Sequence, residues 1–147
     1  MPGGIGAVNL DYPSARFSGR RDIERTSVRP LVSIVDDDPK VRIGLSSLLR
    51  AEGYRVNQYD HAEAFIAALP EGRPDCLLTD IQLPGFDGLG LQLEIRRQFP
   101  DLPIIVMTAY PNPAVRDQAN RQGALCFLGK PFSSEELLRF IHRAVER

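Results

Sequence analysis

The sequence predicts an α/β protein in which one parallel sheet of five strands lies between two layers of helices. Five short runs of strand character alternate with segments of helical periodicity: 31–35, 54–59, 76–79, 104–107 and 125–129. Regular strand–helix alternation is typical of a parallel sheet with right-handed crossovers. Aspartates or a lysine also follow three of the runs directly. Since ligand sites of open α/β sheets lie beyond the carboxyl ends of their strands, these polar residues are expected to share one pocket.

The first helix is expected to begin after Asp38, which offers an N-cap, with Pro39 in its first turn. Four apolar residues then recur at helical spacing: Val41, Leu45, Leu48 and Leu49. Gly53 ends this helix. The strand that follows, Tyr54 to Tyr59, is short and polar, which favours an edge position in the sheet.

The second and third helices have similar punctuation. Asp60 to Glu63 has the form of a capping box, and the helix it opens is expected to end before Pro70. Asp87 precedes the third helix, which stops at Pro100. Its apolar residues are Leu89, Leu91, Leu93, Ile95 and Phe99.

The fourth helix is expected over residues 113–122, with Gly123 as its stop. Ser133 to Glu136 caps the last helix. Its inward residues are Leu137, Leu138, Ile141 and Val145. This (βα)5 pattern fits a flavodoxin-like fold, a three-layer sandwich whose parallel sheet has the strand order 2-1-3-4-5.

Composition bounds the function as well as the fold. A chain of 147 residues with 43% hydrophobic content can bury one core, and its formal charge of -1 provides no basic field for nucleic acid or an anionic membrane. Cys76 and Cys126 both fall in expected strands, which favours buried free thiols in a cytoplasmic protein. No apolar stretch approaches the roughly 18 residues of a membrane span, and the N-terminus lacks the apolar core of a secretory signal.

Residues 1–28 are expected to form a disordered tail, because they show no sustained apolar periodicity. Two other interpretations stay open. The arginines of this segment could make it a docking arm, or translation could begin near Val28, just before the first strand.

Four groups of residues follow one another at the ends of the predicted strands. They are Ile34 to Asp37, then Asp80 to Pro84 with Gly88, then Thr108 and Ala109, then Lys130 to Phe132. Each group is common by itself, but together and in this order they resemble the receiver domain of bacterial two-component response regulators, with the nitrogen-fixation regulators as the most similar kind. The resemblance covers residues 29–147.

The resemblance implies a binding site for Mg²⁺ or Mn²⁺. Asp37 and Asp80 would bind the ion directly, Asp36 would hold a metal-bound water, and the backbone carbonyl of Gln82 would supply another oxygen. Carboxylates, a carbonyl and retained waters suit a hard octahedral cation. Three clustered carboxylates also repel one another, so metal binding should be coupled to their ionisation.

The resemblance makes Asp80 the nucleophile that accepts a phosphoryl group from a phosphohistidine and so forms an acyl phosphate. Lys130 would neutralise the phosphoryl oxygens, and the backbone N–H groups of Ile81 and Ala109 would donate to them. The hydroxyl of Thr108 would donate once the phosphate has arrived. Family members have a cis peptide bond between Lys130 and the following proline.

Switching is expected to follow from Thr108 moving toward the phosphate, which frees space for an aromatic side chain to rotate. Phe127 occupies the aromatic position; it has no hydroxyl, so its two orientations would differ in packing alone. The alternative is that Phe127 is simply a core residue.

The resemblance also implies the partners. The phosphodonor would be a sensor histidine kinase or a histidine phosphotransfer protein. The expected output surface consists of the fourth helix, fifth strand and fifth helix, for a downstream protein or for a second copy in a homodimer. With no output domain after the last helix, the expectation is a stand-alone receiver that promotes only its own phosphorylation and dephosphorylation, without direct contact with nucleic acid or membrane.

Two other functions stay open. Asp36 to Asp38 after an apolar strand also resembles the motif of haloacid-dehalogenase-like phosphatases, which form a phosphoaspartate with Mg²⁺. That resemblance weakens at Lys40, where the family usually has Thr or Val, and at the missing acid pair after Lys130. The second alternative is a degenerate receiver that binds partners without phosphorylation.

Overall fold

The computed structural model describes residues 29–83 and 87–146, and it contains a single parallel sheet of five strands. The strands are β1 (Leu31–Val35), β2 (Arg55–Tyr59), β3 (Cys76–Asp80), β4 (Ile104–Thr108) and β5 (Cys126–Gly129). Their order is β2-β1-β3-β4-β5, and every neighbouring pair is parallel. This confirms the predicted fold, including the edge position of the polar strand β2. The expected tail at residues 1–28 and Pro84 of the second motif lie outside the described residues.

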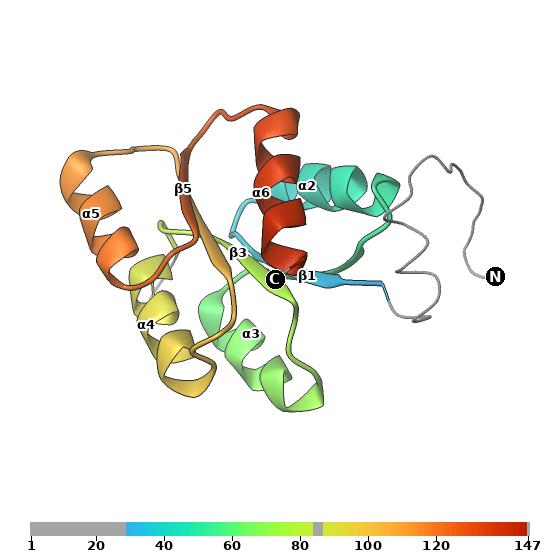
Figure 1. Cartoon of the computed structure of the whole chain (residues 1–147), viewed down its shortest axis with the longest axis horizontal. Helices are drawn as coiled ribbons and strands as arrows, with labels where there is room; N and C mark the ends of the chain where they lie inside the picture. The colour runs from blue at the N-terminus through green and yellow to red at the C-terminus, as the bar shows by residue number, and fades with distance from the viewer. Residues whose placement is uncertain (1–28, 84–86, 147) are drawn as a thin grey trace.

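Helices cover both faces of the sheet, as Figure 1 shows. They are α2 (Pro39–Ala51), α3 (Ala62–Ala68), α4 (Gly88–Gln98), α5 (Pro113–Arg121) and α6 (Ser134–Val145), with a 3₁₀ turn over Leu69–Glu71. The helices α2 and α6 lie on one face, and α3, α4 and α5 lie on the other. Three layers are the arrangement expected for strands buried on both faces.

The predicted N-caps Asp38 and Ser133 are present, and Asp87, expected to precede α4, caps that helix as well. The side chains of Asp38, Asp87 and Ser133 each accept a hydrogen bond from a backbone N–H of the first turn. The predicted capping box at Asp60 is wrong. Helix α3 is capped by His61, whose side chain makes no capping bond, because the carboxylate of Asp60 instead contacts His61 Nδ1 at 2.5 Å.

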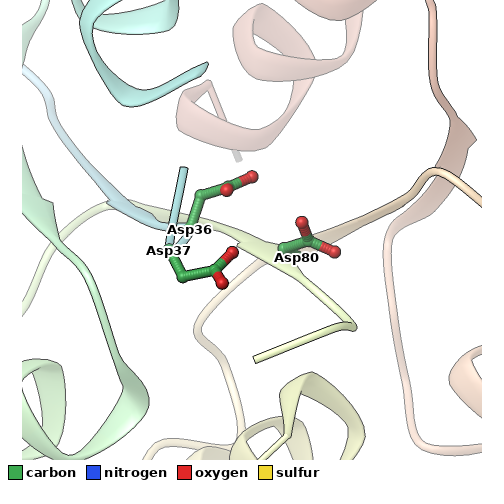
Figure 2. Close-up of side chains that lie close together, drawn as sticks. All are labelled: Asp36, Asp37 and Asp80. Atoms are coloured by element: carbon green, nitrogen blue, oxygen red, sulfur yellow. The ribbon is translucent and has the colours of Figure 1, made fainter. Parts of the chain in front are cut away.

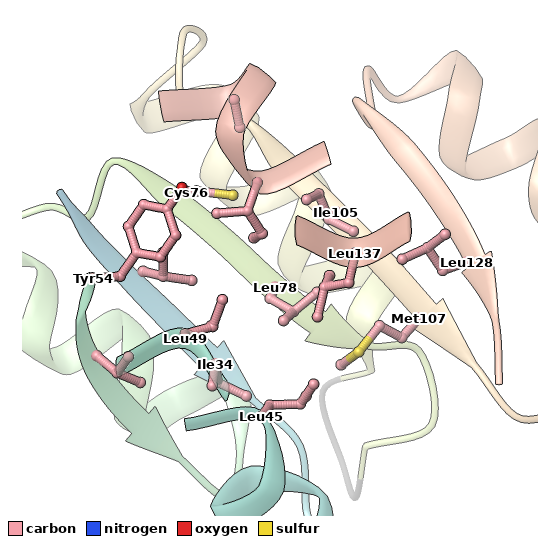
Figure 3. Close-up of a cluster of buried hydrophobic side chains, with 14 of the residues drawn as sticks. Ile34, Leu45, Leu49, Tyr54, Cys76, Leu78, Ile105, Met107, Leu128 and Leu137 are labelled. Carbon is pink, nitrogen blue, oxygen red and sulfur yellow. The ribbon is translucent and has the colours of Figure 1, made fainter. Parts of the chain in front are cut away.

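Two hydrophobic clusters fill the space between the layers. The first, shown in part in Figure 3, joins α2 and α6 to the sheet through residues such as Leu49, Leu78 and Leu137. The second joins α3, α4 and α5 to the other face around Phe65, Leu77 and Ile95. Helix α5 contributes a single fully covered residue to this packing, Ala119. Apolar packing therefore holds α5 less firmly than its neighbours.

Both cysteines are free and buried, Cys76 on β3 and Cys126 on β5, as predicted. Burial raises the pKa of the Cys126 thiol to about 11 and that of Cys76 to about 12, so both thiols are neutral near pH 7. Over the described ranges, no helix has both the length and the apolar character to cross a membrane.

Candidate functional site

The polar residues that the sequence singled out meet at the carboxyl edge of the sheet. Asp36 follows β1 directly, Asp80 ends β3, Thr108 ends β4, and Lys130 follows β5. The parallel register of these strands brings residues together that are up to 94 positions apart in the sequence. The prediction that these polar residues meet at one edge of the sheet is therefore confirmed.

Three carboxylates form an acidic cluster at this edge (Figure 2). Asp36, Asp37 and Asp80 each present an oxygen within 4.8 Å of the others. Asp36 is fully buried and Asp80 is 5% exposed, whereas Asp37 faces solvent. Hard oxygen donors with one open side fit a divalent ion of the Mg²⁺ kind, which keeps several waters when it binds to proteins.

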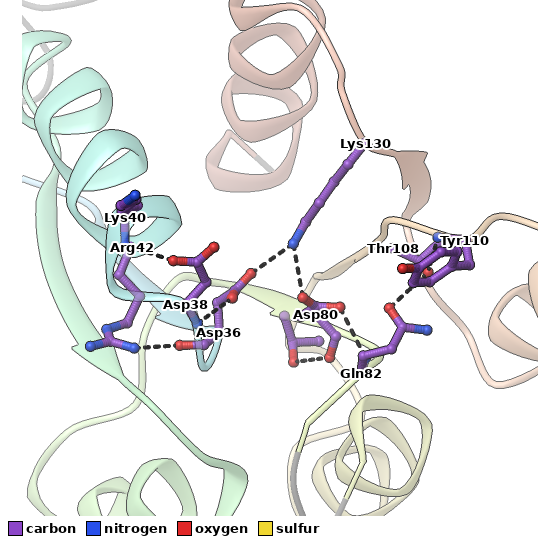
Figure 4. Close-up of polar contacts among 10 residues, drawn as sticks. Asp36, Asp38, Lys40, Arg42, Asp80, Gln82, Thr108, Tyr110 and Lys130 are labelled. Carbon is purple, nitrogen blue, oxygen red and sulfur yellow. Dashed lines mark hydrogen bonds and ion pairs between the residues drawn. The ribbon is translucent and has the colours of Figure 1, made fainter.

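Lys130 supplies the positive charge of the site (Figure 4). Its Nζ lies 3.0 Å from Asp36 Oδ2 and 2.8 Å from Asp80 Oδ2. The lysine side chain is 20% exposed, so one ammonium bridges two carboxylates at the boundary of the core. The peptide bond between Lys130 and Pro131 is cis, as the resemblance implied.

The charges of the cluster shift one another's pKa. Burial raises the pKa of Asp80 above its ordinary value of 3.8, although hydrogen bonds from Lys130 and from the Gln82 amide act in the opposite direction. Burial alone would lower the pKa of Lys130, but its hydrogen bonds to Asp80 and Asp36 outweigh burial and the pKa is raised. The lysine is therefore charged at neutral pH, whereas burial makes ionisation of Asp80 less favourable than in water.

Backbone and side-chain contacts hold the two buried aspartates in place. The N–H of Gln82 donates to Asp80 Oδ1 at 2.9 Å, and the N–H of Asp38 donates to Asp36 Oδ1 at 2.9 Å. Arg42 of α2, which sequence reasoning missed, donates from Nη1 to the Asp36 carbonyl at 2.7 Å. The two N–H bonds orient the carboxylates, and the Arg42 bond holds the backbone of Asp36.

Gly88, the first residue of α4, lets that helix pack directly on the end of β3. A Cβ at this position would lie 2.1 Å from the Asp80 carbonyl oxygen and 2.8 Å from the Ile81 Cα. Only a residue without a side chain permits this approach. The spacing of Gly88 from Asp80 in the motif therefore has a steric cause.

The backbone amide of Ile81, a predicted donor to a phosphoryl group, has a partner within the sheet in this structure. Its N–H donates to the Met107 carbonyl at 2.9 Å and so belongs to the sheet. The amide that lies on the Asp80 carboxylate is that of Gln82, one residue further. Ala109, the other predicted amide donor, is exposed directly after Thr108.

Thr108 is fully buried, and its hydroxyl has two partners (Figure 4). Oγ1 donates to Gln82 Oε1 at 3.0 Å and accepts from the Tyr110 N–H at 3.0 Å. Sequence reasoning did not find the contact with the Gln82 side chain. Phe127, the predicted switch aromatic, is half-buried on β5. It packs against the second hydrophobic cluster, which lies between the sheet and α3, α4 and α5.

Comparison with known proteins places the chain in a family. The family model described as "Response regulator receiver domain" matches residues 32–142. DNA-binding transcriptional regulator NtrC of Proteus hauseri is 40% identical over 114 residues, which cover 78% of this chain and 24% of that protein. Transcriptional regulatory protein FixJ of Bradyrhizobium diazoefficiens is 34% identical over 116 residues, which cover 79% of this chain and 57% of that protein. The chain thus spans about a quarter to somewhat over half the length of these relatives.

A solved structure agrees with the sequence relatives. The BeF₃-activated receiver domain of DrrB matches with a TM-score of 0.75 at 26% identity, over 82% of this chain and 100% of that one. These matches favour the receiver resemblance over the phosphatase alternative, which belongs to a different family. Because the family model covers most of the chain, the protein belongs to the family of response regulator receiver domains.

Proposed function

We propose that this receiver domain takes up a phosphoryl group on Asp80 from a phosphohistidine of a sensor histidine kinase or histidine phosphotransfer protein. The observation that carries the proposal is the bridging of Asp36 and Asp80 by Lys130 beside Asp37. A phosphoryl acceptor needs a nucleophilic carboxylate and positive charge beside it. Asp80 has the ammonium of Lys130 beside it, and the oxygens of Asp36 and Asp37 could hold a metal cation as a second positive charge.

In the proposed transfer, an oxygen of ionised Asp80 attacks phosphorus while the phosphorus–nitrogen bond of the phosphohistidine breaks. The imidazole leaves with the electron pair of that bond and takes a proton from water, so the products are an acyl phosphate and a neutral histidine. Lys130 shifts from the carboxylate to the transferred oxygens and neutralises their charge. The amides of Gln82 and Ala109 are the donors proposed for the remaining oxygens.

Mg²⁺, or Mn²⁺ in its place, would neutralise charge between the transferred group and Asp80 when bound. Asp37 and Asp80 would hold it directly, Asp36 through a water, and the Gln82 carbonyl would be a further ligand. The hydrogen bonds from the Asp38 N–H to the Asp36 carboxylate and from the Gln82 N–H to the Asp80 carboxylate support this role. Asp37 is free to turn toward the ion, since its side chain is exposed.

Phosphorylation would then change the surface made of α5, β5 and α6. Thr108 would move its hydroxyl toward the phosphoryl group, and Phe127 would repack into the space that opens. The proposed consequence is altered binding of a downstream protein, or of a second copy of the chain, in the cytoplasm. Direct binding to nucleic acid or membrane is not part of the proposal, and the only reactions promoted are those of Asp80 itself.

An NMR titration with Mg²⁺ and BeF₃⁻, a mimic of the phosphoryl group, tests this function. The amide resonances of Gln82, Ala109 and Lys130 should move together, and those of α5 and β5 should follow at the same occupancy. The variant Asp80→Asn, which cannot bind the mimic through a carboxylate, should show none of these changes. Equal changes in wild type and Asp80→Asn would contradict the proposal.

A further inference from the structure

We propose that the side chain of Gln82 restrains Thr108. The hydrogen bond between them, called the latch below, must break before the threonine hydroxyl can contact a phosphoryl group. The inference rests on the proposed function of Asp80 and adds a positioning residue to it. Its basis is the 3.0 Å hydrogen bond from Thr108 Oγ1 to Gln82 Oε1, which joins residues 26 positions apart. Figure 4 shows the two side chains meeting between β3 and β4.

The hydroxyl of Thr108 has no second proton to donate. A threonine hydroxyl is one donor with two acceptor positions, and here the donor is used by Gln82 while an acceptor position is used by the Tyr110 N–H. Contact with an oxygen of a phosphoryl group therefore requires the bond to Gln82 to break. Gln82 and the phosphoryl group compete for the same proton.

Gln82 is well placed to couple this release to events at Asp80. Its backbone N–H donates to Asp80 Oδ1 at 2.9 Å, while its side chain holds Thr108. A movement of the Asp80 carboxylate on phosphorylation therefore acts on the same residue that restrains the threonine. The exposed side chain of Gln82 can turn to solvent on release, because water satisfies its amide there.

The competition has a measurable size. A neutral hydrogen bond contributes on the order of 1 kcal/mol net, so removing the acceptor at residue 82 should tighten binding of a phosphoryl mimic by about 3- to 10-fold. The variant Gln82→Met keeps the length of the side chain and the backbone groups, but has no strong acceptor. Thr108→Val removes the hydroxyl while keeping the β-branched shape.

A double-mutant cycle on the full chain tests the latch, with BeF₃⁻ and Mg²⁺ as the probe. Affinities are measured by NMR titration for wild type, Gln82→Met, Thr108→Val and the double variant. Gln82→Met should bind about 3- to 10-fold more tightly than wild type, and the same change in the Thr108→Val background should alter affinity by less than about 2-fold. Gln58→Met, at an exposed glutamine on β2, is the matched control and should bind as wild type does.

Unchanged or weaker binding by Gln82→Met would overturn the latch, and so would equal tightening with and without the Thr108 hydroxyl. A second readout separates the latch from the proposed function. In the ligand-free protein the methyl resonance of Thr108 should move in Gln82→Met and stay in place in Gln58→Met. If wild type binds no BeF₃⁻, the proposed function fails; if the Thr108 methyl resonance ignores Gln82→Met, the latch fails.

Discussion

The ammonium of Lys130 lies 2.8 Å from Asp80 Oδ2, although 50 residues separate the two in the sequence. The same ammonium lies 3.0 Å from Asp36 Oδ2, so it bridges the two buried carboxylates. A lysine in this position stabilises a cluster of like charges that would otherwise repel one another.

Replacing Lys130 by methionine should lower the free energy of unfolding of the metal-free protein by about 1–3 kcal/mol, because a buried carboxylate then loses its charged partner. Urea unfolding at neutral pH measures this. Adding Mg²⁺ should restore part of the loss, since a bound cation replaces the missing charge. Lys40→Met, at the chain's other lysine, is the control: Lys40 is exposed on α2 and its loss should leave stability nearly unchanged. Equal losses in the two variants would contradict the bridging role.

The affinity for Mg²⁺ should rise with pH, because the ion needs ionised carboxylates and burial raises the pKa of Asp80. The sign for stability is the opposite. Between the unfolded pKa near 3.8 and the raised folded pKa, the folded state binds more protons, so the free energy of unfolding without metal falls as pH rises. Calorimetric titration with Mg²⁺ at about pH 5 and about pH 7.5 tests the first statement. In Asp80→Asn the affinity for Mg²⁺ should lose most of its pH dependence. A pH-independent affinity in wild type would contradict the prediction.

Gly88→Ala should destabilise the protein by about 1–3 kcal/mol, because the added Cβ meets the Asp80 carbonyl at 2.1 Å and α4 must move. Gly44→Ala is the matched control within α2. Its Cβ meets nothing within 4 Å, so the helix propensity of alanine should raise stability by about 0.5–1 kcal/mol. Urea unfolding of both variants gives the comparison. Effects of the same sign would show that the close packing of α4 on β3 is not as described.

Gln92→Leu should loosen α5. Gln92 is fully buried on α4, donates to the Ala119 carbonyl of α5 at 2.8 Å and accepts from Gln122 at 3.2 Å. The Ala119 carbonyl and the Gln122 side chain each keep one other hydrogen bond. The free energy of opening of α5 should therefore fall by only about 1 kcal/mol, which corresponds to about 5-fold faster amide exchange in α5. Hydrogen exchange read by NMR or mass spectrometry measures it. Gln98→Leu, at an exposed position of α4, should leave the exchange of α5 as it is; similar rates in all three proteins would refute the anchoring role.

The sheet and most of the site were accessible from the sequence, because local patterns determine them. Buried parallel strands appear as apolar runs, and caps such as Asp38 and Ser133 act within a few residues. The aspartates and Lys130 come together through topology alone, since parallel strands end at one edge. No side-chain detail was needed for that inference.

The misses concern choices among nearby partners. Asp60 could cap α3 or pair with His61, and the structure has the pair. Thr108 could donate to several groups, and its bond to Gln82 depends on side-chain orientations that no local pattern specifies. Gln92 could have been found, because the buried positions 88, 91, 92 and 95 follow helical spacing and place it on the inner face of α4. Leu93, which the sequence analysis grouped with the apolar residues, is 52% exposed.

Intact-protein mass after incubation with acetyl phosphate and Mg²⁺ tests the central claim most directly. Wild type should gain one phosphoryl group, and the gain should vanish in Asp80→Asn and when the metal is chelated. Lys130→Met should retain the carboxylate yet gain the group far more slowly, since it lacks the fixed cation. A phosphoryl adduct of equal yield on Asp80→Asn, or none on wild type that binds Mg²⁺, would contradict Asp80 as the acceptor.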